Sequence, residues 1–139
     1  MATPTPTTWT RWDGTRGCAY WDAAWTAGVT DNFTDHVVID ISTLGAPTPT
    51  AIKIKGVYAS LNGDITATLE FDATTDEHIY TFRGQTDGSL REGLDFSELP
   101  SSGFNATKTA AGFVGDLLLT TTNVASGDEL TLLVLFEKS

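Results

Sequence analysis

The sequence predicts an all-β protein, a sandwich of two packed antiparallel sheets with about eight strands in jelly-roll topology. Threonine is abundant and there are 13 glycines, whereas Lys and Arg together number only 8. Threonine favours strands and turns over helices, because its branched Cβ restricts χ1. Apolar residues recur with a period of two almost throughout, and no segment sustains the 3.6-residue period of a helix. We therefore expect less than about a tenth of the chain to be helical, well below the usual third.

The chain starts with an alternation of Thr and Pro, "MATPTPTT", which favours an extended segment over a collapsed one. We expect residues 1–12 to form an extended arm that contributes little to the melting temperature. The "DGTRG" stretch (residues 13–17) is expected to form a turn after the arm. Residues 13–139 then fit a single sandwich domain.

All four tryptophans lie within the stretch from Trp9 to Trp25. Trp21 and Trp25 share one face of the expected first strand, so at least one should be core. Trp9 and Trp12 border the arm, and an exposed tryptophan needs a partner. A sugar ring that stacks on the indole, or a pocket on another protein that receives it, would be such a partner. Position beside an extended arm favours the protein partner.

Several short strands follow along the first half of the chain. "HVVIDIS" (residues 36–42) is β-branched and reads as one strand. In "AIKIKGVYASL" the apolar residues change parity at Gly56, which predicts a β-bulge. Asn62–Asp64 ("NGD") predicts a hairpin turn, because Asn and Gly tolerate positive φ. "DITATLEFD" (residues 64–72) then alternates cleanly between core and solvent.

The second half contains two weaker strand patterns, residues 78–83 and 89–96, and two stronger ones, residues 112–122 and 128–137. The stronger pair is joined by the turn-rich "NVASG". Residues 128–137 are apolar on both faces, which predicts a central strand that is covered on both sides. The expected buried residues are Ile65, Leu69, Phe71, Leu117, Leu119, Leu132, Val134 and Phe136.

Charge and composition exclude some partners. The formal net charge is −10, and the basic residues are scattered without a cluster. Direct binding to nucleic acid or to an anionic membrane is therefore not expected. No apolar run approaches the roughly 18 residues of a membrane span, and no signal peptide is evident. With Cys18 as its single cysteine, the chain is expected to be made in a reducing cytoplasm.

Catalytic signatures are weak. His78 lies beside Asp76 and Glu77, so a metal or acid–base role is an alternative, but a strand-edge or surface histidine is favoured for both His78 and His36. Cys18 is interpreted as a small buried apolar residue, because a nucleophilic cysteine needs a neighbouring base and partial exposure. The acidic turn "FDATTDE" (residues 71–77) could hold Ca²⁺ through Asp72, Asp76 and Glu77, but it departs from the EF-hand pattern and a solvated turn is favoured. We predict no catalytic residue, no metal and no cofactor. A small sandwich hydrolase, with a carboxylate pair or a Cys–His arrangement, is an alternative.

Three segments carry a resemblance to a known family: "RWDGTRGCAYWD", "SLNGDITATLEFDATTDE" and "AAGFVGDLLLTTTNVASGDELTLLVLFEKS". With the acidic composition and the Thr/Pro arm, they resemble the small jelly-roll cement (decoration) proteins of short-tailed phages. The resemblance implies a non-enzymatic virion protein on the outer surface of the assembled capsid. Such a protein bridges major capsid subunits against internal DNA pressure, and a homo-oligomer, dimer or trimer, is expected.

We predict that Trp9, Trp12, Arg11 and Arg16 contact the major capsid protein. Tryptophan and arginine are enriched at the sites that dominate the binding energy of interfaces. The alternative is a carbohydrate-binding β-sandwich, an adhesin or tail-associated module, that uses the same exposed tryptophans to stack on sugars.

Overall fold

The computed structural model describes residues 2–99 and 102–139, and Met1 of the expected arm lies outside them, as do the side chains of residues 85–89. The all-β prediction is confirmed: the described helical structure is one 3₁₀ helix, η1 (Ile41–Thr43). The strands are β1 (Thr7–Trp12), β2 (Arg16–Ala24), β3 (His36–Ile39), β4 (Ile52–Phe71), β5 (Glu77–Asp95), β6 (Phe104–Asn105), β7 (Leu117–Thr122) and β8 (Glu129–Lys138).

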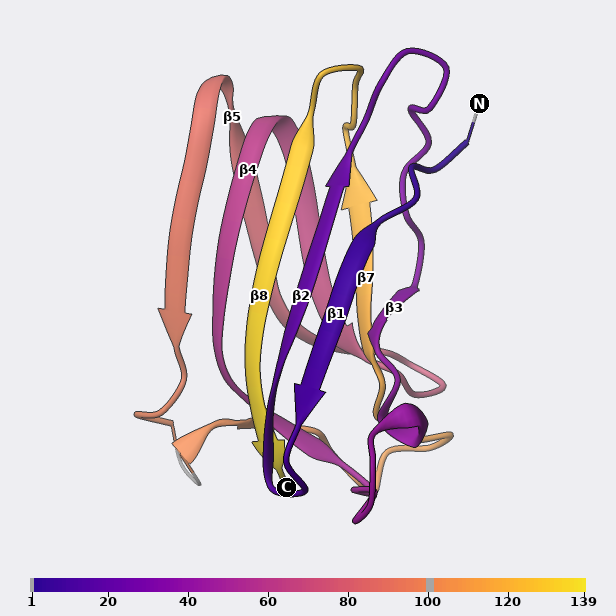
Figure 1. The fold of residues 1–139 in the computed structure, drawn as a ribbon, viewed down its shortest axis with the longest axis vertical. Helices are drawn as coiled ribbons and strands as arrows, with labels where there is room; N and C mark the ends of the chain where they lie inside the picture. Colours follow the sequence, from indigo (N-terminus) through magenta and orange to yellow (C-terminus); the bar gives the residue numbers. More distant parts are fainter. Residues whose placement is uncertain (1, 100–101) are drawn as a thin grey trace.

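The strands form one antiparallel eight-stranded sheet in the order β1-β2-β8-β4-β7-β3, with β5 and β6 also paired to β4. Strand β4 joins the two halves of the sheet, because its first half pairs with β8 and its second half with β7. Figure 1 shows β4 and β5 bending over at one end, so that the sheet curves back on itself and is nearly closed. Two separate sheets and a jelly-roll topology, as expected from the sequence, are not confirmed.

The expected hairpin at Asn62–Asp64 is wrong, because β4 continues through these residues. Gly63 does adopt a positive φ of 103°. The pairing of β4 with β5 shifts register on both sides of Gly63. The Asn-Gly pair therefore supplies the backbone freedom for the bend in β4, and does not close a two-residue loop.

The predicted bulge at Gly56 is confirmed, since the register between β4 and β8 shifts between Ile54 and Gly56. The shift lets Ile54 and Val57 both point inward although they differ in parity, and both are fully buried. Elsewhere strand bounds differ from expectation. The patterns at residues 78–83 and 89–96 belong to the single strand β5.

The core lies inside the curved sheet, and all eight residues expected there are buried. Trp21 and Trp25 are also fully buried, as expected for at least one of them. Phe33 packs edge-on against both indoles, with centroid distances of 5.2 and 5.8 Å. The Nε1–H of Trp25 donates to the carbonyl of Asp31 at 2.9 Å.

The expected arm of residues 1–12 needs a correction, because Thr7–Trp12 form β1 and pair with β2. Before it, Pro4 is buried, and the N–H of Asp31 donates to the carbonyl of Ala2 at 3.0 Å. Threonine and tryptophan are good strand formers, and the edge of β2 offers hydrogen-bond partners to this segment. The turn at residues 13–17 is present, with Asp13 Oδ1 accepting from the N–H groups of Thr15 and Arg16 at 2.9 and 2.8 Å.

Strand β8 is central, as predicted, between β2 and β4. Its inner face is buried, but its outer face is not covered as expected. Leu133 is half-buried and Leu135 is 36% exposed. This open apolar face is the start of the candidate site.

Candidate functional site

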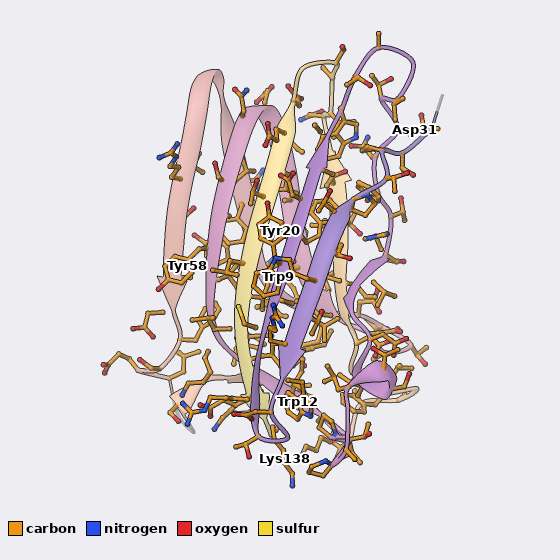
Figure 2. All side chains as sticks on the ribbon, viewed as in Figure 1. Trp9, Trp12, Tyr20, Asp31, Tyr58 and Lys138 are labelled. Atoms are coloured by element: carbon orange, nitrogen blue, oxygen red, sulfur yellow. The ribbon has the colours of Figure 1, made fainter. Side chains whose placement is uncertain are left out.

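The strand register places four large side chains in one row across the outer face of the sheet. Trp9 of β1 lies opposite Tyr20 of β2, Tyr20 opposite Leu133 of β8, and Leu133 opposite Tyr58 of β4. The row ends at Gly93 of β5, which lies opposite Tyr58. Figure 2 shows Trp9, Tyr20 and Tyr58 on the same side of the molecule, over these strands. We call Trp9, Tyr20, Leu133 and Tyr58 the aromatic row.

The row is exposed because alternate residues of a strand point to opposite faces. The neighbours Trp21, Leu132 and Val57 point inward and are buried. In the row itself, Trp9 is 44% and Tyr58 is 53% exposed. Contiguous exposed apolar side chains mark interaction surfaces.

A second row borders the first, with Arg11 opposite Cys18 and Cys18 opposite Leu135. Cys18 is half-buried on this outer face, and burial raises the pKa of its thiol. The thiol therefore contributes apolar surface here more than reactivity. We call the aromatic row together with Cys18 and Leu135 the outer face.

Three contacts hold the rings of the aromatic row in place. Trp9 stacks on Tyr20 with centroids 5.6 Å apart and planes 11° apart, and Arg11 Cζ lies 5.8 Å from the Trp9 ring centroid. The Tyr58 ring lies against Gly93, where a Cβ would come within 3.0 Å of two ring carbons. Rigid aromatic rings lose little conformational entropy on binding.

Between Tyr20 and Tyr58 the surface forms an open groove of about 530 Å³ with Leu133 among its lining residues. Ser60 and Arg91 also line this groove, and they line a neighbouring polar groove together with Asn62 and Glu129. The groove is thus apolar along most of its length and polar at one end.

The structure divides the residues predicted to bind the partner. Trp9 lies on the outer face, and Arg11 lies at its border, beside the Trp9 ring. Trp12 is half-buried at the end of β1, where it stacks on Phe136 at 5.6 Å and its Nε1–H donates to the carbonyl of Gly45 at 3.0 Å. Arg16 is exposed, with Nε 3.9 Å from Asp13 Oδ2. Arg11, Trp12 and Arg16 border a shallow groove of about 410 Å³ that reaches Cys18 and Leu135.

Sequence reasoning missed Tyr20, Tyr58, Leu133 and Leu135 as surface binding residues. The available signal was their parity, because each alternates with residues that are expected to be buried. The two leucines were recognised as a second apolar face but were expected to be covered.

The two histidines lie in different environments. His36 packs against Phe33, with centroids 4.6 Å apart, and burial lowers its pKa. His78 Nε2 is 2.8 Å from Thr81 Oγ1, and both residues belong to β5. Neither histidine lies near Cys18, so the structure does not assemble these three residues into one site.

Carboxylates from three elements come together instead. One oxygen from each of Asp35, Glu70 and Asp76 lies within 4.8 Å of the others, an arrangement that could hold a cation. Burial raises the pKa of Glu70, and the charges of Asp76 and Asp35 raise it further. Of the acidic-turn residues, Asp76 joins this cluster, whereas Glu77 accepts from the N–H and Oγ1–H of Thr107 at 2.9 and 2.7 Å.

The sequence matches no protein-family profile and no curated protein. Among solved structures, 98% of the chain aligns with 42% of a chain from the structure of infectious bursal disease virus Gx strain. That alignment has 13% sequence identity and a TM-score of 0.21, too low to show a shared fold. Within the described residues, no helix is long and apolar enough to cross a membrane.

Proposed function

We propose that this chain is a non-enzymatic virion protein that binds the outside of an assembled phage head and bridges major capsid subunits. The observation that carries the proposal is the outer face, where Trp9, Tyr58 and Leu135 remain exposed in one patch. A partner that covers an exposed apolar face removes that area from water, which favours the complex by about 25 cal/mol per Å².

The geometry of the outer face suits protein binding. Its tyrosine and tryptophan rings are already stacked or seated, so docking would immobilise few side chains. Arg11 and Arg16 lie at its border, where they can pair with carboxylates of the capsid subunit. Trp12 lines the same shallow groove as these arginines and would contribute there.

Sequence resemblance supplies the identity of the partner. It points to cement proteins of short-tailed phages. We also propose the jelly-roll sandwich of that family as the topology of this chain. A net charge of −10 keeps decorated particles soluble. Each oligomer would engage several capsid subunits, so modest individual affinities would combine into firm attachment.

The test is binding to purified heads that lack the protein. Tyr58→Ser and Leu135→Ser should each weaken attachment by about 30-fold, the equivalent of a 2 kcal/mol anchor. Val37→Ser is the matched control, because Val37 is 44% exposed on β3, outside the outer face. Unchanged attachment for both outer-face variants would overturn the proposal.

A second candidate function is carbohydrate binding, which the groove between Tyr20 and Tyr58 favours. Two aromatic rings border it and Arg91, Ser60 and Asn62 stand at its polar end, where they could bind sugar hydroxyls. A glycan array would show specific binding that is lost in Tyr58→Ser. Glycan binding without attachment to heads would select this candidate over the first.

A further inference from the structure

Within the described sheet, strand β1 is an edge strand that pairs with β2 on one side, and the register shows which backbone groups its other side offers. The N–H of Asp13 donates to the carbonyl of Arg16 at 3.1 Å, so Asp13 directs its backbone groups toward β2. The N–H and C=O groups of successive residues point to opposite sides of a strand, so Thr7, Trp9 and Arg11 also direct their backbone groups toward β2. Thr8 and Thr10 therefore direct their N–H and C=O groups away from β2, toward the open edge.

Both faces of β1 are open as well. Thr7 to Arg11 are all exposed. This includes Thr8 and Thr10, although their partners on β2, Trp21 and Ala19, point inward and are buried. Among the described residues, a contact occupies the end of the strand, where the Nε1–H of Trp12 donates to the carbonyl of Gly45. The free edge thus runs from Thr7 to Arg11, and its centre is Trp9.

The other edges of the described sheet are protected in ways that β1 is not. Strand β3 has four residues and a register shift between Val37 and Ile39. Strand β5 carries charged residues and several register shifts against β4. Short length, bulges and charges are the usual devices against edge-to-edge pairing. Strand β1 has six residues with no acidic side chain, no proline and no register shift.

We propose that β1 pairs antiparallel with β1 of a second copy, around a two-fold axis at Trp9. In this register Thr8 lies opposite Thr10 of the partner subunit and Thr10 opposite Thr8 of the partner subunit. These two pairs exchange about four hydrogen bonds, two for each pair. The two Trp9 residues form the close, non-hydrogen-bonded pair between them, an arrangement in which aromatic side chains stabilise neighbouring strands.

Charge and symmetry favour a second copy as the occupant. The chain carries a net charge of −10, so most surfaces of two copies repel each other. Strand β1 contains no carboxylate, and Arg11 already lies by Trp9 within one chain. In the paired strands each Arg11 is also the diagonal neighbour of the partner subunit's Trp9. The tryptophan that is 44% exposed in the isolated chain then lies beside its own symmetry mate on the joined outer face.

The pairing would join the two outer faces into one continuous surface with two copies of the groove. This inference does not depend on the proposed function, because it concerns the protein alone. If the outer face does bind capsid subunits, the two-fold dimer supplies the two attachment points that bridging requires.

Sedimentation equilibrium of the full chain between about 1 and 100 µM tests the pairing. We expect a monomer–dimer equilibrium in this range. Thr10→Pro removes the outward N–H while the β1–β2 ladder stays intact, and should weaken dimerisation by at least about tenfold. Thr10→Val keeps the N–H and the strand preference, and is the matched control that should still dimerise. A monomer throughout, or a dimer unaffected by Thr10→Pro, would overturn the proposal.

Disulfide trapping reports the register independently of any folding defect in the proline variant. In a Cys18→Ser background, Trp9→Cys should form disulfide-linked dimers, because paired Cα atoms at that position are about 4.5 Å apart. Thr10→Cys alone should cross-link less, since its opposite residue is Thr8. Equal cross-linking at the two positions would contradict the register. A monomer that loses attachment to heads through Thr10→Pro would instead assign the edge to a capsid segment.

Discussion

The two halves of this sheet have similar inner faces and different outer faces. On the far half, formed by β7 and the adjoining parts of β4 and β5, most outward residues are polar, and several are hydrogen-bonded to one another. Leu118, opposite Glu70, is apolar but buried. Thr68 and Thr81 hydroxyls lie 3.1 Å apart, and Thr120 Oγ1 donates to Asp35 at 3.4 Å. On the near half, the corresponding positions of β1, β2, β8 and β4 carry the aromatic row.

The difference shows how to separate fold from function in such a sheet. For the sheet to fold, the side chains on its outer face need only be compatible with solvent. Hydrogen-bonded threonines meet this requirement on the far half. An aromatic outer face gains its stacking contacts but leaves apolar area in water. The inner faces therefore account for the fold, and the outer face of the near half is left for the binding proposed above.

The largest expected effect tests whether that separation holds. Phe71→Ala removes a ring that is 1% exposed, and should reduce the free energy of unfolding by about 3–5 kcal/mol. Leu135→Ser, on the outer face, should change it by no more than about 0.5 kcal/mol. Urea denaturation of both variants measures the two values.

A large loss of stability in Leu135→Ser would break the comparison. It would mean that the outer leucines support the fold directly. Weaker binding of that variant to heads would then result from partial unfolding and not from a lost contact with the capsid. The measured slope of free energy against urea should match the original protein, so that the two midpoints are comparable.

Much of the architecture could be predicted from local pattern. The alternation in residues 64–72 gave the inward set correctly, and the change of parity at Gly56 indicated the bulge, because both depend on the two-residue period of a strand. The same argument placed at least one of Trp21 and Trp25 in the core, and both are buried.

What could not be predicted depends on pairing between distant strands. The bend at Gly63 uses the same residue preferences as a hairpin, and only the partners β8 and β7 distinguish the two outcomes. The aromatic row requires the register of five strands to be known together. The arm was misjudged because a Thr/Pro composition describes residues 1–6 but not the strand that follows.

A smaller effect sharpens the comparison within the near half. Deleting residues 1–10 removes the Trp9–Tyr20 stack and most of the β1–β2 hydrogen bonds. We expect the free energy of unfolding to fall by about 1–3 kcal/mol, less than for Phe71→Ala because β1 is exposed on both faces. Deleting only residues 1–6 leaves β1 in place and should cost less. An unchanged melting temperature after the longer deletion would restore the free arm expected from the sequence.

The smallest effect concerns the carboxylates on the far half. Glu70 is close to Asp35 and Asp76, and burial together with their charges raises its pKa in the folded protein. A carboxyl with a raised folded-state pKa binds more protons when folded, so stability is full below the unfolded pKa and falls as pH rises through the folded pKa. Glu70→Gln removes this loss, and should stabilise the protein at pH 7 by up to about 0.5 kcal/mol. The advantage should vanish below about pH 4, where the carboxyl is protonated in both states.

Thermal unfolding from pH 3 to pH 8 measures this advantage, with Glu98→Gln as a charge-matched control outside the cluster. A variant that is less stable than the original protein at pH 7 would show that the Glu70 carboxylate is held by a favourable contact, and the far half would then owe its stability to more than its threonines.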